Sequence, residues 1–251
     1  MVTIVGMDAA QTIRDAVSRV TDLRQAAESS PPLQAAILAV KRFQARRFAL
    51  TYADLLKSTV YQGAARFFLE ELYGDRDYSE RDAQFARIAG ALQRIFPDQA
   101  VATAVSLASV HALTEEIDHE MGRAWLAQSF AACPAESLRY VKAWKQVGRA
   151  ADRNLQLKSI LALGRDLDRL TRTNGLRMML KLMRRPARTA GLSDLQEFLE
   201  SGFDTFAQMS RIGGETEKFL LMIQQRETSL MEELFLVEDD VVAARFAGLQ
   251  L

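Results

Sequence analysis

The sequence predicts an all-α protein, and three observations lead to this fold class. Apolar residues recur at helical spacing over most of the chain, as Phe85, Ile88 and Leu92 do. Prolines and pairs of turn residues separate these runs. The sequence contains no two runs of alternating β-branched residues joined by a turn. We therefore expect a multi-helix bundle of roughly ten helices.

The first helix is expected over residues 8–28. The second is expected to start at residue 32 and to continue towards Tyr61, either unbroken or with a break near Thr51. Asp8 is suited to cap the first helix, and two serines followed by two prolines separate it from the second. The second helix directs apolar residues inward. Its outer side is expected to carry four cations, namely Lys41, Arg42, Arg46 and Arg47.

The central helix is expected from Tyr61 to Tyr73, where the sequence is apolar on most sides of a helix. Gly74 is suited to end this helix in the left-handed conformation. Ser79 and Asp82 have the spacing of a capping box, which would open the next helix, and that helix would stop at Pro97.

Caps and turn residues predict the later boundaries. Asp98 is expected to start a helix of small residues, and Thr114 to start another that ends near Phe130. A helix from Ala135 continues, as one bent helix or as two, up to the turn signal Asn174-Gly175. A short helix from Leu176 is expected to end at Pro186. Ser193 and Gln196 have the spacing of a capping box for the next helix, in which Gly202 would let a neighbouring helix approach closely. Gly213-Gly214 is expected to separate it from a helix over about 215–235, and Asp239 to start a shorter last helix.

Two stretches of the chain resemble a known family. The segment YQGAARFFLEELYGDRDYSERD, from Tyr61 to Asp82, is similar to a bacterial family of unknown function whose members carry FFLEELYG followed by D and then RD. The second match is MLKLMRRPARTAGLSDLQEFLESGFDTFAQM together with Arg226-Glu227, so the resemblance covers about residues 40 to 236. It implies an all-helical cytoplasmic protein and brings no biochemical activity with it.

Length and composition predict one globular unit. The chain has 251 residues, of which 49% are apolar, enough for a substantial core. We expect a single all-helical domain over residues 1–251, in which a boundary between two lobes would fall near residues 131–136. Lysine plus arginine and aspartate plus glutamate both number 32, so no overall field attracts the chain to nucleic acid, and no specific nucleic-acid binding is expected.

The location predicted from the sequence is the cytoplasm. A single cysteine excludes an internal disulfide and fits a reducing compartment. The N-terminus MVTIVGMDAAQ lacks the features of a secretion signal, and no window is apolar and uncharged enough to be a transmembrane segment.

The central stretch carries the first set of candidate ligand-binding residues. Charges on a mostly apolar helix are unfavourable to bury unless they are paired, so we expect Arg66 and Glu70 to meet partners such as Arg81 or Asp82. A buried network of this kind either orients a ligand or locks the packing of helices. The set comprises Tyr61, Arg66, Glu70, Tyr73, Asp77, Arg81 and Asp82.

A basic stripe forms the second set. Arg177, Lys181, Arg184 and Arg188 recur at steps of three or four, which places them on one face of a helix. They are candidates for binding phosphate groups, an acidic protein partner or a membrane surface. The alternative is a solvated face whose cations pair with acids elsewhere in the fold.

Two histidines suggest a metal site, which we do not predict. Glu116 and His119 have the Glu-x-x-His spacing of helical di-iron proteins, but a second such pair is absent. His111 and His119 lie about 12 Å apart on a continuous helix, so they share an ion only if the helix breaks near Thr114. Haem needs one axial histidine and is not excluded by the count. No cofactor is predicted. The alternative to a metal site is a solvated, acidic start of a helix.

Two functional hypotheses follow. The leading one is a non-enzymatic helical protein that binds another protein or a second copy of itself, since no complete catalytic set occurs. The alternative is a small-ligand receptor or an enzyme that uses the polar set from Tyr61 to Asp82, with a metal near His119. A cavity at that set distinguishes the two.

Overall fold

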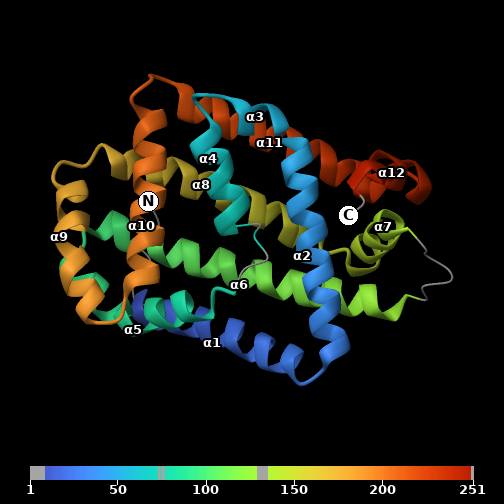
Figure 1. Ribbon diagram of the computed structural model, residues 1–251, viewed down its shortest axis with the longest axis horizontal. Coiled ribbons are helices and arrows are strands. Elements are labelled where there is room, and N and C mark those ends of the chain that lie inside the picture. The colour runs from blue at the N-terminus through green and yellow to red at the C-terminus, as the bar shows by residue number, and fades with distance from the viewer. Residues whose placement is uncertain (1–8, 73, 75–76, 129–134, 250–251) are drawn as a thin grey trace.

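The all-α prediction is confirmed. The computed structural model describes residues 9–72, 74, 77–128 and 135–249, and every regular element in these ranges is helical (Figure 1). The described chain contains twelve α-helices, a π-helical segment and a short 3-10 helix, in place of the roughly ten helices expected. None of the described helices combines the length and apolar character needed to cross a bilayer.

The elements follow one another closely along the chain. The first half contains α1 (Ala9–Glu28), α2 (Pro31–Thr51), α3 (Ala53–Lys57), α4 (Gln62–Phe67), the π-helical η1 (Phe68–Leu72), α5 (Ser79–Ile95) and α6 (Asp98–Ala127). The second half contains α7 (Glu136–Val147), α8 (Ala150–Thr171), α9 (Leu176–Thr189), α10 (Ser193–Ser210), α11 (Glu215–Leu236), α12 (Asp239–Arg245) and the 3-10 helix η2 (Ala247–Leu249).

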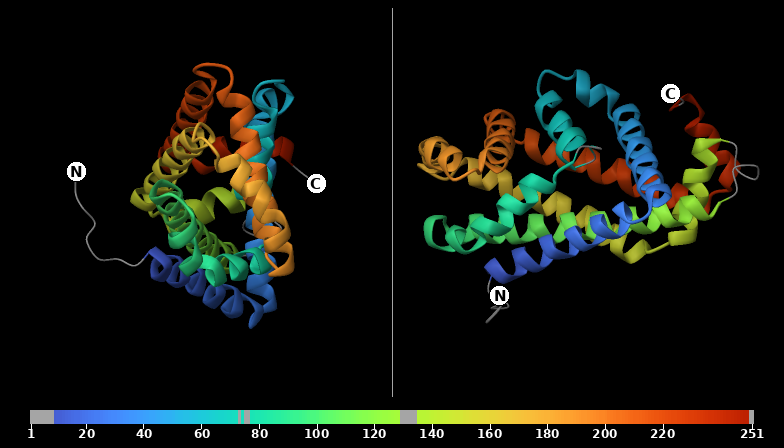
Figure 2. Two further views of the ribbon diagram at one scale, coloured as in Figure 1. Left: turned by 90° about the vertical axis from the view of Figure 1, so that its left-hand side faces the viewer. Right: turned by 60° about the horizontal axis from the view of Figure 1, so that its bottom comes forward.

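Helix α6 is the axis of the fold. It runs unbroken for 30 residues, and α1, α2, α7 and α8 all pack against it. Figure 1 shows α1 lying along α6 while α2 crosses it steeply, and Figure 2 shows α9 with α10 at one end of the molecule and α7 with α12 at the other. Gly122 permits the crossing with α2, because a Cβ there would lie 3.1 Å from the Ile37 nitrogen.

The continuity of α6 contradicts the cap predicted at Thr114. The Thr114 hydroxyl donates to the Val110 carbonyl at 2.8 Å, a bond that a threonine can make inside a helix. The side chain therefore needs no helix start to satisfy it. The small-residue run and the acidic run that follows it form one helix instead of two.

Both predicted capping boxes are wrong. The Ser79 N–H donates to the Asp77 carboxylate at 2.8 Å, while Asp82 turns inward to other partners. At the start of α10, the Gln196 amide donates to the Leu180 carbonyl at 2.7 Å. In each case a tertiary partner takes the side chain that local spacing assigned to the cap.

The outcomes at proline and glycine depend on their surroundings. The breaks near Thr51, at Asn174-Gly175 and at Gly213-Gly214 are confirmed, and positive φ angles at Gly148 and Arg149 separate α7 from α8. Pro186 does not stop α9, since it lies on an exposed side where water can bind the carbonyl that loses its partner. Gly74 is not left-handed; a Cβ there would overlap the Glu70 carbonyl oxygen. Gly202 allows a close approach as predicted, with Phe67 3.0 Å from where its Cβ would be.

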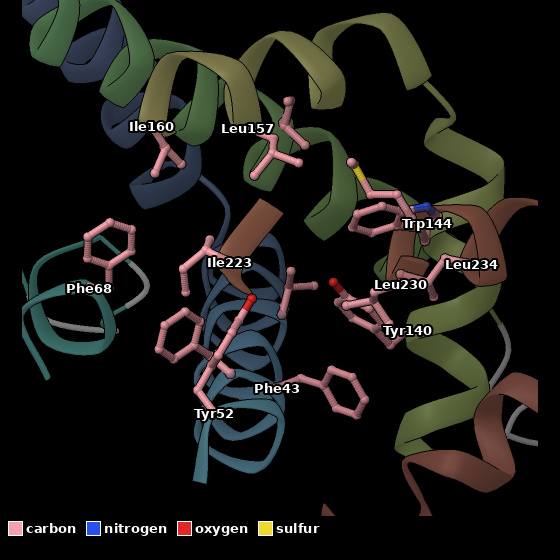
Figure 3. Close-up of a cluster of buried hydrophobic side chains, with 14 of the residues drawn as sticks. Phe43, Tyr52, Phe68, Tyr140, Trp144, Leu157, Ile160, Ile223, Leu230 and Leu234 are labelled. Atoms are coloured by element: carbon pink, nitrogen blue, oxygen red, sulfur yellow. The ribbon is translucent and has the colours of Figure 1, made fainter. Parts of the chain in front are cut away.

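The main apolar core lies between α2, α7, α8 and α11 (Figure 3). Phe43 stacks on Tyr140 with ring centroids 4.3 Å apart and meets the edge of Phe246 at 5.8 Å. This core draws residues from both sides of the segment 131–136, of which residues 131–134 lie outside the described chain. A second cluster joins α1, α5 and α6, and a third joins α8, α9 and α10.

Candidate functional site

A narrow cavity of about 180 Å³ lies beside α6, and α1, α2, α4, α5, α8, α9 and α10 also contribute to its wall. Its lining residues on α6 run from Ala100 to Asp118, a span of about 27 Å at 1.5 Å per residue. An engineered cavity of about 150 Å³ holds one benzene molecule. A similar volume spread over the length of α6 is a channel, which suits an unbranched hydrocarbon chain better than a ring.

The two ends of the channel differ in chemistry. At the Ala100 end most of the lining residues are apolar, many of them from the third core cluster, and the hydroxyl of the nearby Thr103 donates to the Gln99 carbonyl of its own helix. The apolar residues include Phe96, Leu170, Leu176, Leu199 and Phe203. At the Asp118 end polar side chains from three helices gather instead. The channel is therefore amphipathic along its length, as a site for a molecule with a tail and a polar head would be.

Three hydrogen-bonded pairs form the polar end. Lys41 of α2 donates to Glu115 at 2.6 Å, and Gln44, one turn further along α2, donates to Asp118 at 3.0 Å. Gln156 of α8 donates to the Thr114 hydroxyl at 2.7 Å. All six residues line the cavity, so α2 and α8 close this end of the channel against α6.

His111 and Asp82 form a dyad in the wall next to these pairs. The His111 Nε2 lies 2.9 Å from the Asp82 Oδ2, and Arg24 of α1 donates to the same oxygen at 2.6 Å. A carboxylate only accepts, so the Nε2 carries the hydrogen and Nδ1 is the ring nitrogen left for another partner. Burial alone would raise the pKa of Asp82, but the bonds and charges of His111 and Arg24 outweigh it and lower that pKa.

The pKa values of Glu115 and Asp118, two carboxyl groups of α6 at the polar end, are shifted in opposite directions. Burial favours the neutral form of Glu115, but the charges of Lys41, His111 and Arg24 and the hydrogen bond from Lys41 together outweigh it and lower the pKa of Glu115. Asp118 is more deeply buried, and this burial raises its pKa to about 6 although the charges of Lys41 and Arg153 oppose the shift. Buried carboxyl groups with raised pKa values are frequent in functional sites.

One layer of side chains separates the channel from a hollow on the surface. Glu71, Tyr78, Arg81 and Phe198 line both spaces. The Arg81 guanidinium lies 4.1 Å from the Tyr78 ring centroid and 4.7 Å from that of Phe198, and it donates to Glu71 at 2.9 Å. Glu71 belongs to the π-helical η1, a geometry often found at functional sites. This layer is the wall that the channel and the surface hollow share.

The structure brings together only part of the predicted ligand-binding set. Arg81 and Asp82 line the channel, while Asp77 lies in the surface hollow. Arg66 and Glu70 are exposed, while Arg81 bonds to Glu71, and Asp82 bonds to Arg24 and His111. Tyr61 donates to Glu215, a bond that raises the pKa of Tyr61 to about 12, at a distance from the channel wall. Tyr73 lies outside the described residues.

The candidate metal ligands point to different partners. Because α6 is continuous, His111 and His119 stay about 12 Å apart along its axis. Glu116 pairs with Arg149 at 3.1 Å. The Nδ1 of His119 is buried without a hydrogen bond, and burial lowers its pKa. Within the described ranges, no three His, Cys, Asp or Glu side chains are arranged to hold a metal ion.

The basic stripe lies on the exposed side of α9. Arg177 pairs with Asp204 at 2.9 Å, and Arg184 donates from its Nε to Glu200 at 2.8 Å, so two of the four cations meet acids of α10. Lys181 and Arg188 are exposed. The alternative stated from the sequence, in which the cations of the stripe pair with acids elsewhere in the fold, therefore holds for Arg177 and Arg184.

Sequence reasoning missed the residues of α2 and α8 that complete the channel. Lys41 and Arg47 were expected on the outer side of α2, yet Lys41 lines the cavity and Arg47 is buried against Glu227 of α11. Lys41 and Gln44 lie three apart and directly follow the buried Val40 and Phe43, so they place polar groups at the edge of a buried face. That placement was the available signal.

Comparison with known proteins places the chain in a family. Residues 23–241 match the family described as Domain of unknown function (DUF8198). The chain belongs to this family. The DUF8198 match includes Arg24 and every polar residue of the channel, and it confirms that the family has no assigned function, as the resemblance implied. No curated protein and no solved structure matches the chain.

Proposed function

We propose that this protein binds an unbranched amphiphilic molecule in the channel beside α6. The observation that carries the proposal is the polarity gradient of one internal space, from the apolar cluster at Ala100 to the polar pairs at Asp118. A hydrocarbon tail would lie along α6, and its head would reach Lys41, Gln156 and Asp118. This is the receptor alternative of the sequence analysis, and its polar residues come mainly from α2, α6 and α8.

The energetic case rests on apolar contact. Burial of a hydrocarbon chain contributes about 0.8 kcal/mol for each methylene group removed from water. Because the channel is already formed in the protein, binding costs little conformational entropy of the protein. The polar end then fixes the direction in which the molecule lies. The single cysteine of the sequence supports a reducing environment, and we propose that this binding takes place in the cytoplasm.

The replacement Ala108→Phe tests this function. Ala108 is buried at the channel wall, about 15 Å along α6 from Asp118, so a phenyl ring there would occupy the space that a decyl tail needs. Titration calorimetry with 1-decanol should show saturable binding to the unmodified protein with a negative heat-capacity change, and binding at least about 10-fold weaker to the variant. Ala102→Phe is the control, because Ala102 lies on the exposed side of the same helix.

Equal binding to the Ala108 and Ala102 variants would reject the channel as the site. Absence of saturable binding by the unmodified protein would reject the function itself. Circular dichroism during heating shows whether either variant has lost its fold, which separates blockage from unfolding.

A second candidate function is self-association through α9. The helix exposes Met178 and Leu182 at 60% and 69% beside the cations Lys181 and Arg188. The hollow at the channel wall carries the carboxylates of Asp77, Glu80, Asp194 and Glu197. A cationic face with exposed apolar side chains on one copy complements this acidic hollow on another. We propose this contact as the form that the predicted protein interaction takes.

Alanine replacement of Arg177, Lys181, Arg184 and Arg188 tests this contact. Sedimentation at low salt should show association of the unmodified protein, and a dissociation constant at least about 10-fold higher for the variant, because the attraction between faces is lost. Replacing Lys57, Arg94, Lys158 and Arg211 removes the same charge from other exposed positions. Equal weakening by this control set would show a net-charge effect and contradict a contact at α9.

A further inference from the structure

The polar end of the channel holds more carboxylates than cations. Its six residues include the carboxylates Glu115 and Asp118 but only one cation, Lys41, which donates to Glu115 at 2.6 Å. The bonds from Gln44 to Asp118 and from Gln156 to Thr114 come from neutral amides. The second oxygen of each carboxylate is still an acceptor. A cationic head group therefore matches the charge of this end better than an anionic one.

Asp118 lacks a cation of its own. Its side chain is 5% exposed, the Gln44 amide lies 3.0 Å from its Oδ1, and no ion pair reaches it within the described part of the chain. The nearest cations have other partners. Lys41 pairs with Glu115 at 2.6 Å, while the Arg153 guanidinium lies 3.4 Å from the Trp144 ring centroid and donates to the Gly148 carbonyl. A buried carboxylate without a cation is unfavourable, and a positively charged ligand would relieve that.

We infer that the molecule held in the channel is a long-chain primary amine, whose ammonium group pairs with the Asp118 carboxylate while its alkyl chain lies along α6 towards Ala100. This inference rests on the proposed function and specifies its ligand. The ammonium supplies three donors and the missing positive charge. The raised pKa of Asp118 agrees with it, because the empty site favours the neutral acid and a bound cation would reverse that preference.

The test compares three ligands that share one chain: decylamine, 1-decanol and decanoate. Titration calorimetry at about pH 7.5 should show the amine binding at least about 10-fold more tightly than the alcohol, because a close charge pair in a dry site adds well over a kilocalorie, and decanoate binding most weakly. In Asp118→Asn the amine and the alcohol should bind within about twofold of each other, with affinity for the alcohol unchanged.

Two controls exclude non-specific uptake of a cationic surfactant. Asp98→Asn removes a carboxylate from the exposed start of the same helix and should leave the preference for the amine intact. Ala108→Phe should abolish binding of all three ligands, since it occupies the part of the channel that their alkyl chains share.

The outcomes separate the two proposals. Equal or tighter binding of the alcohol or of decanoate by the unmodified protein would overturn the amine inference and leave the channel function standing. The amine inference is overturned in the same way if Asp118→Asn keeps the full preference for decylamine. Failure of all three ligands to bind would overturn the function itself.

Discussion

Replacing Arg47 by methionine is expected to lower the free energy of unfolding by about 3–5 kcal/mol, because it leaves the Glu227 charge buried without its partner. Arg47 and Glu227 are 4% and 7% exposed, and the Arg47 Nη1 lies 2.5 Å from the Glu227 Oε1. The Tyr52 hydroxyl donates to the same oxygen at 2.8 Å. This group joins α2 to α11, near the core shown in Figure 3, and urea unfolding followed by circular dichroism measures the loss.

A second variant tests the mechanism of that loss. Adding Glu227→Gln to Arg47→Met removes the buried charge and keeps an acceptor for Tyr52, so the double variant should recover more than about half of the stability. Arg42→Met, on the exposed side of the same helix, should change stability by less than about 0.5 kcal/mol. A double variant as unstable as the single one would contradict the account, since a lost packing contact would not be restored by neutralising Glu227.

Asp118→Asn is expected to stabilise the protein at neutral pH. The pKa of Asp118 is about 6 in the folded protein, against 3.8 for the ordinary group, so the folded state binds the extra proton between these values. Stability from this group is therefore greatest below about pH 4 and falls as the pH rises through 6. The difference amounts to about 3 kcal/mol, which asparagine avoids because it carries no charge.

A comparison of the unmodified protein with Asp118→Asn across pH separates the contribution of Asp118 to stability from that of its neighbours. Lys41, Glu115 and Arg153 face this group from α2, α6 and α8 and are present in both proteins. Asp82 and Glu115, whose pKa values are lowered, lose their contribution as the pH falls in both. Urea unfolding at intervals from about pH 4 to 8 should give a gap that opens with rising pH. A constant gap would mean that Asp118 has an ordinary pKa.

The Asp118 carboxylate is thus expected to have opposite effects on folding stability and on ligand binding. The carboxylate lowers stability in the empty protein, while the proposed amine needs it for binding. A site that is unfavourable for folding and favourable for a ligand is typical of function, because stability alone would select asparagine or an apolar residue there. The ligand comparison and the pH series test these two halves separately.

The sequence predicted the helices well because their causes are local. Period and turn residues lie within one helix and its ends, so the breaks at Thr51, Gly175 and Gly214 could be read directly. The errors occur where a side chain had a choice of partner. Thr114 bonds within its own helix, Asp82 bonds to α1 and α6, and Gln196 bonds to α9.

The candidate site was predicted only in part for the same reason. Arg81 and Asp82 were identified because charges next to an apolar run need partners, and both line the channel. Asp118 is one of several acids that follow His111 in the chain, and its isolation from cations depends on the pairing of Lys41 with Glu115 and on the stacking of Arg153 on Trp144. No spacing in the chain encodes those choices.

By itself the sequence determined that this protein is helical, where most of its helices begin and end, and that a single chain can bury a large apolar core. These follow from local propensity and from composition. Only the tertiary structure decided that α6 is one long helix and that α2 and α8 bring polar residues against it to form an amphipathic channel. The physical reason is that a cavity and an unpaired buried charge are properties of how helices pack, and residues distant in the chain determine both.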